Sequence, residues 1–145
     1  MYSKYVNDPS VFYSVKKIRN AIIAGLILLA GLKSSEIINM KCIDVDPVDR
    51  VIYVRSKKSR IVEIPDDQFW TFMMMYIQSR CGSDMYKKLF DVNERTIRRI
   101  CREIFNTNIS TIRRIIAKEW LRIMDRMEVS RLLGISTKQL HNLIK

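Results

Sequence analysis

Basic side chains recur at helical spacing in the last third of the chain, and phosphate binding is the chemistry they suit. Arg95, Arg99 and Arg102 share one face of a predicted helix, and a guanidinium, always charged, can hold a phosphate through two hydrogen bonds. Residues 91–145 contain 12 Lys and Arg against 6 Asp and Glu. We predict a phosphate-binding stripe here, the alternative being a solvated charged face. Its members are Arg95, Arg98, Arg99 and Arg102, followed by Arg113, Arg114, Lys118 and Arg122.

Residues 127–145 match the pattern of a helix-turn-helix. Gly134 tolerates the unusual backbone angles of the turn, and Ser136 is placed to cap the second helix. Exposed side chains of that helix can donate to base edges and phosphates. The alternative is a packed helical corner without a ligand. The predicted DNA contacts on the second helix are Lys138, His141, Asn142 and Lys145.

The middle of the chain carries the only β pattern, and its last turn is basic. Segments 43–46, 51–54 and 61–64 are rich in β-branched residues, which predicts a small antiparallel sheet of three strands. Residues 55–60 form the charged tip of the last hairpin. Lys57, Lys58 and Arg60 are the candidate phosphate contacts on it.

These groups need a scaffold, and the rest of the sequence reads as helices. The apolar residues of segment 15–32 keep helical spacing, with Gly31 as a stop. We predict a single domain with an N-terminal arm over residues 1–15 and a packed, mostly helical body over residues 16–145. The remaining predicted helices are 34–40, 68–80, 85–89, 93–105, 110–124, 128–133 and 137–144.

Composition limits the classes of function. A formal charge of +11 on 145 residues attracts polyanions, nucleic acid before an anionic membrane surface. The single histidine argues against a metal centre, and we expect no cofactor. The apolar run 21–32 is too short to cross a bilayer and no cleavable signal precedes it. Three scattered cysteines suggest reduced thiols, so we expect an intracellular protein, cytoplasmic or associated with the nucleoid.

In order and spacing, these pieces resemble the catalytic domain of the tyrosine recombinases, the phage-integrase family. Gly31–Ile37 is similar to the family box Gly-Leu-Arg-x-x-Glu-Leu, and the hairpin matches the family's lysine-bearing turn, with Lys57 best placed and Lys58 as the alternate. Ser110–Arg113 aligns with the His-x-x-Arg box. Leu133–Ile135 aligns with the Leu-Gly-His box, and the nucleophilic tyrosine position, nine residues beyond that histidine position, falls on Ile144.

The resemblance implies an α+β, mostly helical domain with a three-stranded sheet, but without an intact catalytic set. In the family a tyrosine attacks a phosphodiester, two arginines stabilise the charge that develops and a lysine acts as general acid. Ser110 and Ile135 replace histidines here, and Ile144 cannot attack. The family-equivalent positions are Lys33, Glu36, Lys57, Ser110, Arg113, Ile135 and Ile144.

We therefore expect a lone, degenerate domain of viral or mobile-element origin that binds double-stranded DNA without cutting it. It would regulate or compete in recombination, or act architecturally, as a monomer or weak dimer, with four-way junctions and an active recombinase as further candidate partners and no membrane. The alternatives are a helix-turn-helix transcription regulator, a residual recombinase or phosphodiesterase that needs a nucleophile in trans, and a protein-binding domain without nucleic acid.

Overall fold

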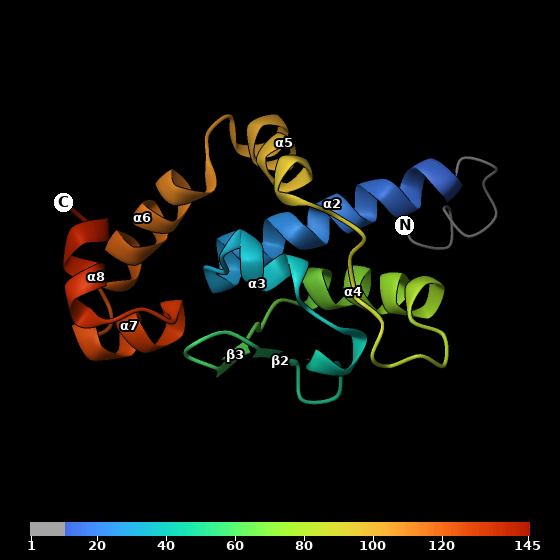
Figure 1. Ribbon diagram of the computed structural model, residues 1–145, viewed down its shortest axis with the longest axis horizontal. Coiled ribbons are helices and arrows are strands. Elements are labelled where there is room, and N and C mark those ends of the chain that lie inside the picture. The colour runs from blue at the N-terminus through green and yellow to red at the C-terminus, as the bar shows by residue number, and fades with distance from the viewer. Residues whose placement is uncertain (1–10) are drawn as a thin grey trace.

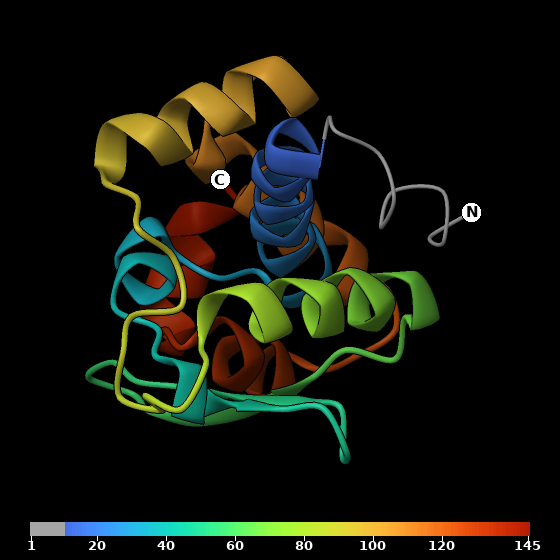
Figure 2. The same ribbon diagram turned by 90° about the vertical axis from the view of Figure 1, so that its right-hand side faces the viewer.

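A long apolar helix, α2 (Val11–Ala30), forms the centre of the molecule. The computed structural model describes residues 11–145, and Figure 2 looks nearly along α2, with α4 (Asp67–Arg80) on one side and α5 (Glu94–Phe105) on the other. The side chains of Ile23, Leu26 and Ile27 are completely buried. This helix therefore supplies the core against which the other elements pack. The remaining helices are α3 (Ser34–Ile38), α6 (Ile109–Trp120), α7 (Arg126–Leu133) and α8 (Thr137–Leu143).

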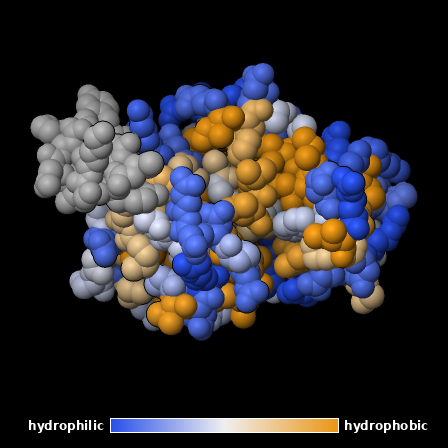
Figure 3. Space-filling model, turned by 180° about the vertical axis from the view of Figure 1, so that it is seen from behind, coloured by the Kyte–Doolittle hydropathy of each residue, from blue (hydrophilic) through white to orange (hydrophobic). Residues whose placement is uncertain are grey.

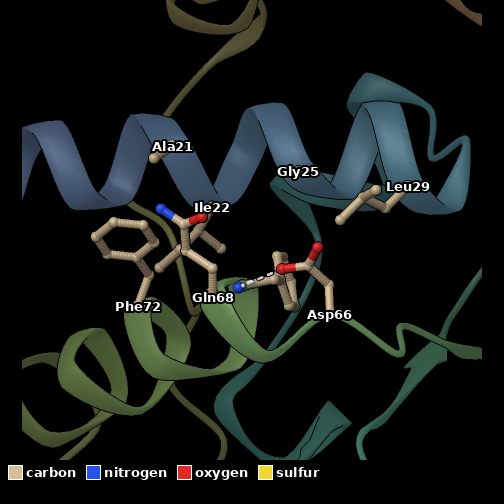
Figure 4. Close-up of a pocket in the computed structure, with 8 residues that line it drawn as sticks. Ala21, Ile22, Gly25, Leu29, Asp66, Gln68 and Phe72 are labelled. Atoms are coloured by element: carbon tan, nitrogen blue, oxygen red, sulfur yellow. Dashed lines mark hydrogen bonds between the residues drawn. The ribbon is translucent and has the colours of Figure 1, made fainter.

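The contact between α2 and α4 depends on a glycine. Gly25 faces α4, and a Cβ atom there would lie 2.8 Å from the Phe69 ring. Figure 4 shows Gly25 opposite the start of α4, where the Asp66 carboxylate accepts a hydrogen bond from the Phe69 backbone N–H at 2.8 Å. The absence of a side chain thus lets α4 approach, and the Asp66 cap fixes where α4 begins.

The predicted three-stranded sheet is confirmed. β1 (Val45–Asp46), β2 (Val51–Val54) and β3 (Arg60–Glu63) pair antiparallel in that order, with Tyr53 opposite Ile61. Side chains alternate across the sheet, so Ile52 and Val62 point into the core. Residues 55–59 connect β2 to β3, which places the charged turn at one end of the sheet (Figure 1).

Side-chain caps explain most helix starts. Asn93, Asn108, Asp125 and Ser136 each accept a hydrogen bond from the backbone N–H three residues later, at the start of α5, α6, α7 and α8. Helix α2 begins at Val11, inside the predicted arm over residues 1–15. Residues 1–10 of that arm lie outside the described part of the chain.

The helix predicted over residues 85–89 is wrong. The backbone of this segment bonds instead to the segment after α3: Leu89 N–H to Met40 O at 2.8 Å, Cys42 N–H to Lys87 O at 2.9 Å and Ile43 N–H to Met85 O at 2.8 Å. These pairings replace the predicted five-residue helix because so short a helix has few hydrogen bonds of its own.

The cysteines also differ from the prediction of three reduced thiols. Cys42 and Cys81 form a disulfide, and only Cys101 is a free, buried thiol among the described cysteines. The two partners are 39 residues apart in sequence, so their spacing carries no local signal. The disulfide removes the cysteines as an argument for a reducing compartment.

The C-terminal helices have a small core of their own. Val129, Leu133, Ile135 and Leu140 are buried together with Ala117 of α6. Gly134 ends α7 with φ of +67°, a left-handed conformation that favours glycine, and the chain turns there into α8. No helix within residues 11–145 is both long enough and apolar enough to span a membrane.

Candidate nucleic-acid interface

A hollow of about 290 Å³ lies between the start of α3, the β2–β3 turn and the turn at Gly134. It joins three segments that are far apart in the sequence, and four of its side chains are cationic. Asp44 holds one of the four, Arg55, through an ion pair of 2.6 Å. The lining residues are Lys33, Ser35, Glu36, Asn39, Arg55, Ser56, Lys57, Lys58 and Gly134.

A buried ion pair forms the floor of this hollow. Arg60 Nη1 lies 2.6 Å from Glu36 Oε2 and Arg60 Nη2 lies 3.1 Å from Glu36 Oε1. Burial raises the pKa of the Glu36 carboxyl, but the Arg60 hydrogen bonds and the Lys33 backbone N–H outweigh burial, so that pKa lies below its usual range. Glu36 therefore stays ionised and Arg60 neutralises it, which leaves the hollow with an excess of positive charge.

The structure overturns the prediction that Arg60 contacts DNA. Its side chain is 3% exposed, and Nε donates to Leu132 O at 2.7 Å, so its donors serve the protein. A Cβ atom at Gly134 would overlap the Arg60 guanidinium, and glycine is therefore required there. A sequence signal was present: Arg60 is in phase with Val62 and Ile64, and all three face the core.

The environment of the hollow shifts the pKa of Lys33. Partial burial lowers the pKa of its ammonium group; Glu36 raises that pKa, and the nearby positive charges of Arg113, Arg60 and Lys58 lower it further. A bound phosphate would oppose the two effects that lower this pKa, burial and repulsion by the nearby cations, since it supplies negative charge beside the ammonium. Lys33 is thus poised to respond to an anion in the hollow.

Arg113, predicted as a phosphate contact, is mainly bonded to the backbone. Its Nε donates to Gly31 O at 2.9 Å and its Nη2 to Leu133 O at 3.1 Å. Burial lowers the pKa of its guanidinium. Arg60 and Arg113 therefore bind two successive carbonyls, Leu132 and Leu133, at the end of α7 and attach the C-terminal helices to the body of the domain.

The first residue of α5 lies close to the start of α3, which lines the hollow. Ser34 Oγ donates to Glu94 Oε1 at 2.6 Å, which joins the residue after Lys33 to the first residue of α5. The guanidinium groups of this face are exposed, while Ile97, Ile100 and Cys101 of α5 are buried. The exposed arginines are Arg95, Arg98, Arg99 and Arg102, and Arg114 on α6 is also exposed.

The predicted contacts on α8 are on the surface as well. Lys138, His141, Asn142 and Lys145 are all exposed. In Figure 1, α5 lies above α3 and the α7–α8 pair lies to its left. Three basic surfaces, on the β2–β3 turn, α5 and α8, thus belong to different elements of the fold.

The other family-equivalent positions have packing roles or face solvent. Ile135 is 7% exposed in the C-terminal core, and Ile144 is half-buried against the same core. Ser110 is exposed in the first turn of α6. The sequence reasoning missed Arg55, Ser35 and Asn39 as lining residues; Arg55 belongs to the same charged turn as the predicted lysines, whereas Asn39 carried no signal.

Part of the surface is unsuited to phosphates. Figure 3 shows apolar side chains gathered in the middle of the back face, and Leu28, Leu29 and Ile115 are among the exposed apolar residues. Aliphatic groups offer no donor to an anion. The hollow and its flanking helices are therefore the stronger candidate for a nucleic-acid interface.

Comparison with solved structures identifies the fold. The chain superposes on XerA recombinase with a TM-score of 0.75 and 24% sequence identity over 90% of its residues. This chain has the fold of a tyrosine recombinase domain. It also matches the Tn1549 transposon integrase in complex with circular intermediate DNA, with a TM-score of 0.63 and 17% identity over 99% of the chain.

The match to tyrosine recombinases covers only part of each relative. This chain spans 53% of the XerA chain and 57% of the Tn1549 integrase chain. A further Tn1549 integrase structure, in complex with transposon right end DNA, matches with a TM-score of 0.59 and 16% identity. No protein-family model and no curated protein sequence matches this chain. The mostly helical α+β fold predicted for the tyrosine recombinase resemblance is therefore confirmed at the level of the fold.

Proposed function

We propose that this domain binds double-stranded DNA without cleaving it. The observation that carries the proposal is the basic hollow, where Lys33, Lys57 and Lys58 surround a floor whose only carboxylate, Glu36, is neutralised by Arg60. Phosphate neutralisation by such cations is the main source of affinity for DNA. The Tn1549 integrase, which shares the fold, is described in complex with DNA.

The exposed helices extend this contact beyond one phosphate. Arg95 and Arg98 lie on α5, whose first residue is bonded to α3 beside Lys33. Lys138 and Asn142 project from α8, on the other side of the hairpin turn (Figure 1). A duplex presents regularly spaced phosphates and base edges, so these surfaces suit it better than a small anion. Junction DNA offers the same groups and is the second substrate to test.

Absence of cleavage follows from the residues at the family-equivalent positions. Strand cleavage by this fold requires a nucleophile and groups that transfer protons, and Ile144, Ile135 and Ser110 supply neither a tyrosine nor a histidine. Arg113, moreover, donates two hydrogen bonds to backbone carbonyls. The proposed role is therefore that of an intracellular, nucleoid-associated regulator, competitor or architectural factor in recombination.

A nicked suicide duplex tests binding and cleavage in one experiment. We expect a salt-sensitive complex on a native gel and no covalent protein–DNA adduct after denaturation, with an active recombinase as the positive control. A covalent adduct would refute the inert function and favour a residual recombinase. If no complex forms even at low salt, DNA binding itself is refuted, and the exposed apolar residues would then favour a protein partner.

A second candidate is an operator-binding regulator that uses the C-terminal helices alone. The separate core of α7 and α8 and the exposed Lys138 and Asn142 favour it. Under this function Lys138→Ala and Asn142→Ala would each cost roughly 1–3 kcal/mol of sequence preference. Lys57→Ala would leave affinity unchanged, whereas the first proposal requires a loss.

A further inference from the structure

A second hollow, of about 370 Å³, lies on the α7–α8 side of the hairpin turn. It is formed by the end of the turn, by α7 and by the first residues of α8. Lys58 lines both this hollow and the basic hollow described above. One lysine therefore separates two neighbouring concave surfaces, and a ligand held in the first is next to the second.

The chemistry of the second hollow differs from that of the first. Most of its exposed atoms are carbon, although only two of its lining side chains, Ile135 at the turn and Met127 on α7, are apolar. The Met127 side chain is 77% exposed, so no other described residue covers it. Lys58 and Arg131 supply positive charge at its edge. Cations can hold the phosphates of a nucleotide, and the adjacent apolar side chains offer its base a surface to contact.

A buried hydroxyl in the lining also lacks a partner. Ser130 is 5% exposed, and its Oγ is the one buried side-chain polar atom without a hydrogen bond in the part of the chain that the structure describes. Buried polar groups are usually satisfied, so an orphan of this kind calls for an explanation. A ligand with hydrogen-bonding edges in the adjacent hollow offers one.

We propose that the second hollow binds the base and sugar of an unpaired nucleotide whose phosphate lies in the first hollow. The inference rests on the proposed DNA binding and adds a preference for DNA with an unstacked base. A base inside a duplex is stacked and paired, so it cannot enter a concave surface; a bulged, nicked or junction nucleotide can. Apolar contact with Met127 replaces part of the lost stacking, and Lys58 contacts the backbone between the two sites.

The test compares two duplexes of equal length, one fully paired and one with a single bulged 2-aminopurine, a base whose fluorescence depends on stacking. We expect the wild-type protein to bind the bulged duplex about 5-fold more tightly, and to change the 2-aminopurine emission on binding. Met127→Ala should abolish this preference and leave affinity for the paired duplex unchanged. Ile123→Ala, which removes an apolar side chain that is 80% exposed and does not line the hollow, is the matched control.

The outcomes separate this inference from the function on which it depends. Equal affinity of the wild-type protein for both duplexes, with unchanged emission, overturns the nucleotide site while DNA binding stands. The same holds if Met127→Ala and Ile123→Ala behave alike, or if Met127→Ala weakens both duplexes equally. Loss of the preference in Met127→Ala alone supports the site. Failure of the wild-type protein to bind either duplex overturns both proposals.

Discussion

The buried arginines and the exposed cations of this domain have opposite environments although they are close in sequence. Arg60 and Arg113 donate to Glu36 and to the backbone of Gly31, Leu132 and Leu133. Lys57 and Lys58, only three and two residues before Arg60, are exposed on the hairpin turn. The cations behind the net charge of +11 therefore form two groups. Some hold the fold together, and the others are available to phosphates.

Mutation of the buried cations should have the largest effect on the free energy of unfolding. Removing one partner of a buried ion pair leaves the other charge uncompensated, so Arg60→Met should lower the free energy of unfolding by roughly 3–5 kcal/mol. The double variant Arg60→Met/Glu36→Met should cost less than the sum of the single changes. Denaturant unfolding measures both.

The exposed pair of Arg131 and Glu128 is the control for that experiment. Their side chains are 55% and 43% exposed, and exposed ion pairs of this kind contribute little to stability. If Arg131→Met costs as much as Arg60→Met, burial does not distinguish the two groups of cations and the comparison fails.

Arg113 should show a smaller effect on stability. Arg113→Ala leaves the carbonyls of Gly31 and Leu133 without their donors, which should cost roughly 1–3 kcal/mol in unfolding experiments. Arg114→Ala, at the adjacent exposed position, should change stability by no more than about 0.5 kcal/mol. Equal stability of the two variants would mean that Arg113 does not hold the C-terminal helices.

Mutation of the exposed cations should weaken DNA binding and leave the free energy of unfolding nearly unaltered. In Arg99→Ala/Arg102→Ala, each lost phosphate contact should reduce the slope of log K against log salt by about 0.9. The free energy of unfolding should stay within roughly 0.5 kcal/mol of the wild type for each surface substitution. An unchanged slope would show that the α5 face is merely solvated.

Lys33 is partly buried and also lines the basic hollow, so it shares features of both groups of cations. It should make DNA binding sensitive to pH. Because burial lowers the pKa of its ammonium group, the charge is lost at a lower pH than that of an ordinary lysine, and affinity for DNA should fall as the pH rises through that range. Lys33→Arg keeps its charge and should flatten the profile, as measured by fluorescence anisotropy. Identical profiles for both proteins would exclude Lys33 from the interface.

Local features of the fold were predictable from the sequence. The hairpin follows from β-branched segments around a charged turn, and capping residues such as Asn93 and Asp125 mark helix starts. These signals are local because the residues that form each cap or turn are neighbours in the chain. The order of the family boxes then led to the fold that the structure shows.

Features that depend on contacts between distant segments were not predictable from local sequence patterns. The Cys42–Cys81 disulfide and the pairing of segment 85–89 with segment 40–43 arise only when α4 returns the chain to α3. The ion pair of Arg60 with Glu36 spans 24 residues. The alternation of β3 could have indicated that Arg60 faces inward, but no sequence feature specified Leu132 O as its acceptor.

A salt titration of duplex binding with two charge-matched variants distinguishes DNA binding at the basic hollow from binding through total charge. Lys57→Ala/Lys58→Ala removes two exposed lysines from the basic hollow, and Lys87→Ala/Lys88→Ala removes two exposed lysines from a loop outside it. We predict that the first pair reduces the log–log slope by about 1.8, whereas the second leaves it near the wild-type value. Equal slopes for the two variants would contradict the account, because DNA binding would then follow the total charge rather than this site.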